Sequence, residues 1–120
     1  MSIILKENYW LCPVCRKSLR ANGNSCLCEN RHCFDIAKSG YVNLILSNKS
    51  LHGDDKEMIT ARRTFLNSGH YKILCDALCD SVKSVSEMRT VILDAGCGEC
   101  YYTSEISKSC PEAAVLGIDL

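Results

Sequence analysis

Residues 93–106 read LDAGCGECYYTSEI, and this stretch decides how the C-terminal part of the chain folds. It joins the end of an apolar strand, a turn that contains Gly96 and Gly98, and the start of a helix. A second apolar stretch, AAVLGIDL, follows at residues 113–120. A strand, a helix and another strand in this order predict a β-α-β unit, the beginning of a parallel sheet.

Two helices are predicted ahead of this unit. Asp54 or Asp55 is a candidate N-cap for the first helix, whose apolar residues recur at helical spacing until the sequence NSG at 67–69 ends it. In the second helix, apolar residues step by three and four, which predicts one buried stripe. The stripe consists of Tyr71, Leu74, Leu78, Val82 and Val85.

The N-terminal part of the chain has a different character. Residues 12–32 are polar and rich in turn residues, and Asn22-Gly23 between two short segments predicts a β-hairpin. Residues 34–46 resemble a further strand interrupted at Ser39-Gly40. Residues 47–53 are expected to form a linker.

The sequence therefore predicts an α/β protein with a small β domain at 1–47 and a second domain at 54–120. The formal net charge is zero, but residues 1–47 carry six Lys and Arg against three Asp and Glu. This excess permits an RNA partner without requiring one. The best candidates for RNA contacts are Arg16, Lys17, Arg20 and Arg31.

Cysteine and histidine residues of the first domain are spaced as metal ligands. Cys12, Cys15, Cys28 and His32 give the pattern C-x2-C-x12-C-x3-H. Zinc prefers four such ligands in a tetrahedron, and two short ligand pairs joined by a hairpin supply them. Because protein ligands would fill all four positions, we expect a structural zinc and not a catalytic one.

The identity of the fourth zinc ligand stays open at this stage, because Cys26 or Cys33 could replace His32.

Two further cysteines, Cys75 and Cys79, are four residues apart on a predicted helix. Such a pair can hold a metal, but we interpret these two as small buried apolar residues, as free cysteines commonly are.

The ten cysteines are interpreted as thiols and metal ligands, because no segment is typical of an exported or membrane-spanning protein. No run of 18 apolar residues is present, and the apolar run near the start of MSIILKENYW is too short for a signal peptide. We therefore expect a cytoplasmic protein.

We expect no redox role for the thiols, since we identify no C-x-x-C motif at the start of a helix that follows a strand. Cys97, Cys100 and Cys110 receive no catalytic role.

The turn inside the β-α-β unit has the features of a cofactor site. Asp94, Gly96 and Gly98 precede the helix, where glycines let a ligand approach the backbone and the helix N-terminus offers free N–H groups. Asp119, after the second strand, is placed to accept hydrogen bonds from ribose hydroxyls. The pattern indicates an adenosine-containing cofactor, but Tyr101 stands where a dinucleotide fingerprint has its third glycine.

The form D-x-G-x-G resembles the first motif of the class I S-adenosylmethionine-dependent methyltransferases. The zinc-ligand pairs, RHCFDIAKSGYVNLI, ARRTFLNSGHY and LDAGCGECYYT, in this order, resemble the N-terminal part of the bacterial large-subunit ribosomal RNA (guanine-N1)-methyltransferases. The resemblance runs from about residue 11 to the last residue. It implies a zinc-ribbon-like domain that recognises RNA, followed by the start of a Rossmann-like catalytic domain.

The resemblance also implies roles for individual residues. The implied zinc ligands are Cys12, Cys15, Cys28 and His32. The implied cofactor-binding residues are Tyr71, Asp94, Gly96, Gly98, Glu99 and Asp119. From its spacing alone, Tyr71 fits equally well as a core aromatic residue on the helix stripe.

The implied activity is transfer of a methyl group from S-adenosylmethionine to N1 of a guanine in a hairpin of ribosomal RNA. No residue is assigned as the catalytic base, and Cys100 stands where the family usually has a glycine. Arg62 and Arg63 could contact phosphate, although ion pairs with Asp or Glu are the favoured interpretation.

The later strands of such a sheet are absent from these 120 residues, so this chain alone is expected to be inactive. An unpaired sheet edge would also permit self-association into a homo-oligomer. The alternative interpretation is a non-catalytic zinc-ribbon module that binds RNA or protein.

Overall fold

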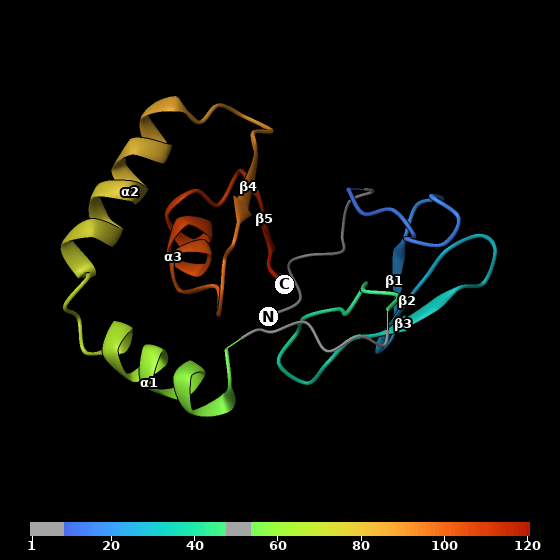
Figure 1. Ribbon diagram of the computed structural model, residues 1–120. Coiled ribbons are helices and arrows are strands. Elements are labelled where there is room, and N and C mark those ends of the chain that lie inside the picture. Colours follow the sequence, from blue (N-terminus) through green and yellow to red (C-terminus); the bar gives the residue numbers. More distant parts are fainter. Residues whose placement is uncertain (1–8, 48–53) are drawn as a thin grey trace. The chain divides into compact units, whose positions relative to one another are not determined.

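The computed structural model describes residues 9–47 and 54–120, and the chain divides into two compact units, Met1–Ser50 and Leu51–Leu120 (Figure 1). Apart from Ser47, the predicted linker lies outside the described residues, as does most of the N-terminal segment considered as an export signal. No helix in the part of the chain that the structure describes is long and apolar enough to cross a membrane.

The first unit contains a three-stranded antiparallel sheet in the order β1-β2-β3 (Figure 1). Its strands are β1, β2 and β3, which span Arg20–Asn22, Ser25–Leu27 and Cys33–Asp35. The predicted hairpin is confirmed, but its two turn residues are Gly23 and Asn24, because Asn22 still pairs with Ser25. Gly23 has a φ of +62°, and its position in the turn needs this left-handed conformation.

The strand predicted at 34–46 is wrong in its extent. Only Cys33–Asp35 pair with β2, and the chain then turns at residues 38–40 before Val42 returns to form an antiparallel bridge with Ile36. The core of this unit is small. Its buried residues are Cys12, Leu19, Cys26 and Cys28, against which Trp10, Cys15, Phe34, Ile36, Val42 and Leu44 pack.

The second unit contains the predicted β-α-β arrangement. Its elements are α1 (Lys56–Asn67), α2 (Lys72–Val85), β4 (Val91–Ala95), α3 (Tyr101–Ser109) and β5 (Ala114–Ile118). Strands β4 and β5 are parallel neighbours, paired from Val91 with Ala114 to Ala95 with Ile118. Helix α3 packs against both β5 and α2, and in Figure 1 it lies between α2 and the two strands.

Helix α1 begins as the sequence predicts. Asp55 is its N-cap, and the Asp55 carboxylate accepts a hydrogen bond of 2.8 Å from the backbone N–H of Met58. None of the 12 residues of α1 is buried, and Met58 and Phe65 are about half exposed. Local capping therefore accounts for where this helix starts better than burial does.

The predicted buried stripe of α2 is wrong. Leu74 and Leu78 are exposed, as are Tyr71 and Val85, and within the predicted stripe only Val82 packs against the core. The buried residues of α2 are Cys75 and Cys79, which form a cluster with Ile106 and Val115. The face of α2 that packs in the core therefore lies next to the predicted stripe and not on it. The interpretation of Cys75 and Cys79 as buried apolar residues is confirmed.

Candidate metal centre and cofactor loop

Four side chains of the first unit converge on one point. The sulfur atoms of Cys12, Cys15 and Cys28 and a ring nitrogen of His32 all lie within 4.8 Å of one another. The Sγ atoms of Cys15 and Cys28 are 3.6 Å apart, and Nδ1 of His32 lies 3.5 Å from Sγ of Cys12 and 3.4 Å from Sγ of Cys28. Spacing in the sequence singled out Cys12, Cys15 and Cys28 and left His32 as the preferred fourth ligand, with Cys26 and Cys33 as alternatives.

These distances fit a tetrahedral zinc ion. With Zn–S bonds of about 2.3 Å and Zn–N bonds of about 2.0–2.1 Å, the ligand atoms of a tetrahedron lie roughly 3.5–3.8 Å apart. Three of the six separations, at 3.4–3.6 Å, fall close to this range, and all six are within 4.8 Å. Three sulfur ligands and one imidazole are also a common donor set for structural zinc, so the residues present fit the ion.

Two similar turns bring the ligands together. The N–H of Arg16 donates to the carbonyl of Cys12 at 2.8 Å, and the N–H of Arg31 donates to the carbonyl of Cys28 at 2.9 Å. Both arginines adopt left-handed backbone conformations, with φ of +59° and +63°. Each turn folds the chain back beside its first cysteine, which directs a pair of ligands toward the same point.

The alternative ligands Cys26 and Cys33 do not join this group. Cys26 is fully buried in the core of the unit, on β2 opposite Phe34. Burial, followed by the proximity of Cys33, raises the pKa of Cys26. Cys33 itself is exposed. Among the described residues, the geometry therefore favours His32 as the fourth ligand.

The thiols in the cluster differ in acidity. A hydrogen bond from the backbone of Lys17 is the main cause that lowers the pKa of Cys15 to about 6, and side-chain contacts with His32 and the other two cysteines act in the same direction. Burial raises the pKa of Cys28. Thiolates are the form that binds metal, so the cluster already contains a thiol that loses its proton readily.

The basic residues predicted to contact RNA are all exposed on this unit; they are Arg16, Lys17, Arg20 and Arg31. Two of them, Arg16 and Arg31, belong to the ligand turns themselves. The metal cluster would therefore fix the backbone from which these two side chains project.

The glycine loop of the second unit lies at the carboxyl ends of both strands. Gly96 and Gly98 have φ of +80° and +53°, a region that side chains other than glycine adopt at a cost. The N–H groups of Gly96 and Cys97 both donate to the carbonyl of Ile118, at 2.8 and 3.0 Å, which ties the loop to the end of β5. A side chain at Gly96 would meet no atom within 4 Å, so its surroundings are open to a ligand.

The side chain of Asp119 contacts this loop. One carboxylate oxygen of Asp119 accepts a hydrogen bond of 2.5 Å from the N–H of Gly98. A carboxylate can accept about four hydrogen bonds, so acceptor capacity remains for a ligand. The structure thus brings together two predicted cofactor residues that are 21 positions apart in the sequence.

Asp94 and Glu99 occupy different surroundings. The Asp94 carboxylate accepts a hydrogen bond of 2.5 Å from the hydroxyl of Thr103 on α3, which orients it toward the start of that helix. One oxygen of Glu99 pairs with Arg63, whereas its other oxygen, Oε2, is buried and has no hydrogen-bond partner. A buried acceptor without a donor is costly, and a ligand donor would relieve that cost.

Tyr71 is the N-cap residue of α2 and is 44% exposed. Its ring contacts Phe65 edge to face, with ring centroids 5.4 Å apart. The interpretation of Tyr71 as a core aromatic residue is therefore wrong, since the tyrosine stands at the end of the helix. This exposed position leaves it available to a ligand.

The two consecutive arginines on α1 form ion pairs, which is the interpretation that the sequence favoured. Arg62 pairs with Asp54, and Arg63 pairs with Glu99. The second pair links α1 to the glycine loop. These contacts explain both arginines without a nucleic-acid phosphate.

The sequence interpretation missed one motif. Cys97 and Cys100 form a C-x-x-C at the start of α3, directly after β4, and their sulfur atoms are 3.5 Å apart. The expectation that no such motif exists is wrong. Cys100 is also the N-cap of α3, with a left-handed φ of +62°, a conformation that glycine adopts at less cost.

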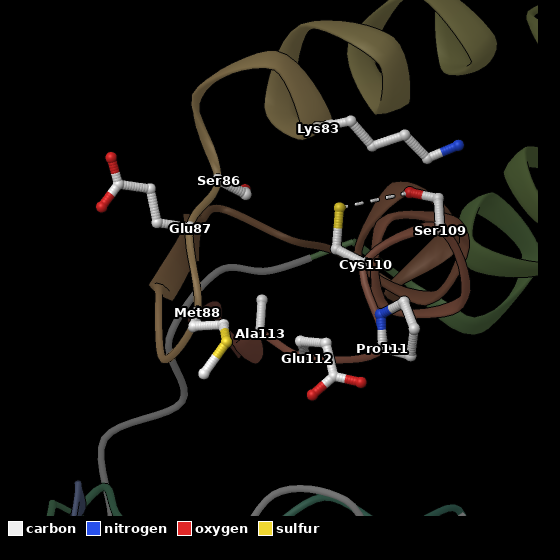
Figure 2. Close-up of a pocket in the computed structure, with 9 residues that line it drawn as sticks. All are labelled: Lys83, Ser86, Glu87, Met88, Ser109, Cys110, Pro111, Glu112 and Ala113. Atoms are coloured by element: carbon white, nitrogen blue, oxygen red, sulfur yellow. Dashed lines mark hydrogen bonds between the residues drawn. The ribbon is translucent and has the colours of Figure 1, made fainter.

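A shallow cavity of about 240 Å³ lies elsewhere on the second unit (Figure 2). Glu87 and Met88, just before β4, and Pro111, just before β5, are among its lining residues, so the cavity lies at the amino ends of the strands. In Figure 2 the carboxylates of Glu87 and Glu112 point outward. Ligands of parallel α/β sheets bind at the carboxyl ends, so the glycine loop is the better candidate site.

Comparison with known proteins agrees with the ligand cluster. Residues 10–50 match the family model described as "RlmA, N-terminal", a zinc ribbon. This segment is similar to the RlmA-type zinc ribbon. The match covers the metal cluster and all three strands of the first unit.

Relatives extend the similarity into the second unit. The chain is 32% identical, over 93% of its length, to the 23S rRNA (guanine(748)-N(1))-methyltransferase of Streptomyces fradiae, of which it covers 41%. It is 32% identical, over 91% of its length, to a putative 23S rRNA (guanine-N(1)-)-methyltransferase of Micromonospora griseorubida, of which it covers 43%.

A third relative is the putative 23S rRNA (guanine-N(1)-)-methyltransferase YxjB of Bacillus subtilis, 38% identical over 73% of this chain and 33% of the relative. The resemblance predicted from the motifs is therefore confirmed. The chain spans about two fifths of the length of the first two relatives.

Proposed function

We propose that this chain is part of an S-adenosylmethionine-dependent enzyme that methylates N1 of a guanine in a hairpin of large-subunit ribosomal RNA. Residues 1–47 would form the RNA-recognition domain and residues 54–120 the first part of the methyltransferase domain. The observation that carries the proposal is the contact between the glycine loop after β4 and Asp119 after β5. The names of the three relatives support the choice of reaction.

The proposed metal is one structural zinc ion, held by Cys12, Cys15, Cys28 and His32. Its role is to hold the two ligand turns together in a unit whose core is too small to be stable on apolar packing alone. The basic residues on these turns would then face RNA phosphates from a fixed backbone. Phosphate contacts of this kind orient a protein on RNA, whereas base contacts provide sequence specificity.

The proposed cofactor-binding residues are Tyr71, Asp94, Gly96, Gly98, Glu99 and Asp119. The loop glycines allow close approach of the ligand to the backbone, and Asp119 accepts hydrogen bonds from the ribose hydroxyls. Glu99 offers its unpaired buried oxygen to a ligand donor. When bound, S-adenosylmethionine supplies an electrophilic methyl group.

The acceptor atom sets a further requirement. N1 of guanine lies on the Watson–Crick edge, so the base must be unpaired or turned out of its stack before it can react. Its N1 proton must also leave, and the attacking nitrogen must align with the methyl group. We assign neither step to a residue of this chain, and the catalytic base stays unknown.

Two further expectations accompany this proposal. We infer a cytoplasmic enzyme, because its proposed substrate is ribosomal RNA. Self-association through the free edge of the two-stranded sheet stays a prediction.

Calorimetric titration of S-adenosylmethionine into the full-length protein tests the proposal. We expect binding, and we expect Asp119→Ala to weaken it by about 1–3 kcal/mol, the usual cost of leaving a hydrogen-bonding group unsatisfied. Because Asp119 also holds the N–H of Gly98, the thermal stability of the ligand-free variant must be measured in parallel. The matched control is Glu112→Ala. Glu112 is exposed and lies at the amino ends of the strands, away from the glycine loop.

Absence of detectable binding by the full-length protein would reject the methyltransferase proposal. The alternative, a non-catalytic zinc-ribbon module, would then be favoured if RNA or protein binding persisted. Equal weakening by Asp119→Ala and Glu112→Ala would reject the assignment of Asp119 to the ribose.

A further inference from the structure

The C-x-x-C motif at the glycine loop has the backbone geometry that a disulfide needs. The N–H of Cys100 donates to the carbonyl of Cys97 at 2.9 Å, so the two cysteines are the first and last residues of a hydrogen-bonded β-turn. The Cα atoms at the ends of a β-turn are less than 7 Å apart, and disulfides join Cα atoms usually 4.4–6.8 Å apart. The turn therefore already holds the backbone at a suitable separation.

The side chains are oriented toward each other as well. The thiol of Cys100 donates to Sγ of Cys97, with the two sulfur atoms 3.5 Å apart. A disulfide bond is about 2.05 Å long, so closure needs the sulfur atoms to approach by roughly 1.5 Å. Rotation of the two side chains can provide such a movement without rearranging the strand or the helix.

We propose that Cys97 and Cys100 are a reversible disulfide site, oxidised by a low-molecular-weight disulfide such as oxidised glutathione. The ring that this bond closes contains Gly98 and Glu99. It therefore fixes the two residues of the loop that contact Asp119 and Arg63. This inference concerns the thiols alone and does not depend on which cofactor the loop binds.

Access separates this pair from another cysteine pair in the same unit. Cys97 and Cys100 are both partly exposed, so a small disulfide can reach them. Cys75 and Cys79 lie close together on α2 but are buried in the core, with exposures of 3% and 8%. An oxidant has to reach a thiol before exchange can begin, so the loop pair should react first.

The two thiols have different roles in the exchange. Cys100 is the N-cap residue of α3, and its side chain makes no capping hydrogen bond to the helix. Burial, then the proximity of Cys100 and of the carboxylates of Asp94 and Asp119, raises the pKa of Cys97 to about 12. Because Cys97 is hard to deprotonate, we assign the first attack to Cys100 and the second step, which resolves the intermediate, to Cys97.

The reaction balances in two steps. The Cys100 thiol loses its proton and attacks one sulfur of the oxidant, which forms a mixed disulfide and releases one small thiol. The Cys97 thiol then loses its proton and attacks the Cys100 sulfur, which forms the intramolecular bond and releases the second small thiol. The protein loses two hydrogen atoms, and the oxidant is reduced to two thiols.

Digestion of the oxidised protein with trypsin provides a direct test. The full chain is equilibrated in a series of reduced and oxidised glutathione mixtures, quenched with acid, alkylated and digested. The tryptic peptide 90–108 contains Cys97 and Cys100 and no other cysteine, whereas peptide 73–83 contains only Cys75 and Cys79 and is an internal control. Mass spectrometry of both peptides then reports each pair separately.

We expect peptide 90–108 to lose two hydrogen atoms and to escape alkylation in mixtures that leave peptide 73–83 fully alkylated, and a reductant should reverse the change. The single variants separate the roles: Cys97→Ser should accumulate glutathione on Cys100, whereas Cys100→Ser should accumulate none on Cys97. Alkylation of peptide 90–108 in step with peptide 73–83 would overturn the proposal. Preferential glutathione addition to Cys97 in the Cys100→Ser chain would overturn the assigned order of attack.

Discussion

At the scale of single residues, the contact between Gly117 of β5 and the glycine loop leaves no room for added atoms. Gly117 on β5 faces Cys97, and a Cβ atom at Gly117 would lie 2.9 Å from the sulfur and 3.2 Å from the Cβ of Cys97. Real Cβ atoms do not approach a neighbour so closely, so one of the two residues must stay small. Gly117 is needed here for space, whereas Gly96 and Gly98 are needed for their backbone conformation.

We expect Gly117→Ala to destabilise the protein by about 1–3 kcal/mol, because the added methyl group overpacks the contact with Cys97. Urea denaturation of the single variants and of the double variant with Cys97→Gly measures the coupling between the two positions. The double variant should lose less stability than the sum of the single variants. Strictly additive losses would contradict this contact.

The metal cluster allows a second comparison of single residues. Cys12→Ser should abolish zinc binding and unfold the first unit, because a hydroxyl replaces one of four ligands. Cys33→Ser is the matched control, since Cys33 is exposed and lies outside the cluster. Elemental analysis of protein purified without chelator should find one zinc per chain in the control and none in Cys12→Ser. Loss of zinc in Cys33→Ser alone would contradict the ligand set.

At the scale of secondary-structure elements, α2 shows that size and hydropathy in the sequence do not identify the buried face. Cys75 and Cys79 pack in the core with Ile106 of α3 and Val115 of β5. The larger Leu74 on the same helix remains 46% exposed. The partner elements therefore decide which face of α2 is buried.

We expect Cys75→Ser to destabilise the second unit by about 1–3 kcal/mol, because it buries a hydroxyl that must find a hydrogen-bond partner in an apolar cluster. Leu74→Ser, at the neighbouring exposed position, should cost less. Thermal unfolding followed by circular dichroism compares the two variants. A larger loss of stability for Leu74→Ser than for Cys75→Ser would contradict this assignment and favour the buried stripe predicted from the sequence.

At the scale of the whole molecule, each unit has its own buried cluster and its own sheet. The first unit has few buried residues, and three of them are cysteines. Two of these cysteines, Cys12 and Cys28, belong to the proposed zinc site. The second unit contains no such cluster among its described residues. The two units should therefore respond differently to loss of metal.

We expect a zinc chelator to unfold the first unit while the second stays folded, because metal binding contributes folding free energy only where the ligands are. Amide resonances of the first unit should collapse to narrow dispersion in an NMR spectrum, and those of α2, β4 and α3 should keep their positions. Addition of zinc should restore the first set. Simultaneous collapse of both sets would contradict two independently folded units.

The sequence by itself determined the features that depend on residues close together in the chain. The hairpin around Gly23, the N-cap at Asp55 and the order β4-α3-β5 follow from local turn, capping and periodicity signals. Ligand spacing also singled out Cys12, Cys15 and Cys28, because short loops restrict where paired side chains can point.

Only the tertiary structure decided the features that depend on distant partners. It separated His32 from Cys26 and Cys33, identified the buried face of α2, and brought Asp119 onto the N–H of Gly98. Burial and approach are set by elements that arrive from elsewhere in the chain, and no local pattern records them. The turn that joins Cys97 to Cys100 is local and its C-x-x-C motif is visible in the sequence, but the approach of the two sulfur atoms is seen only in the structure.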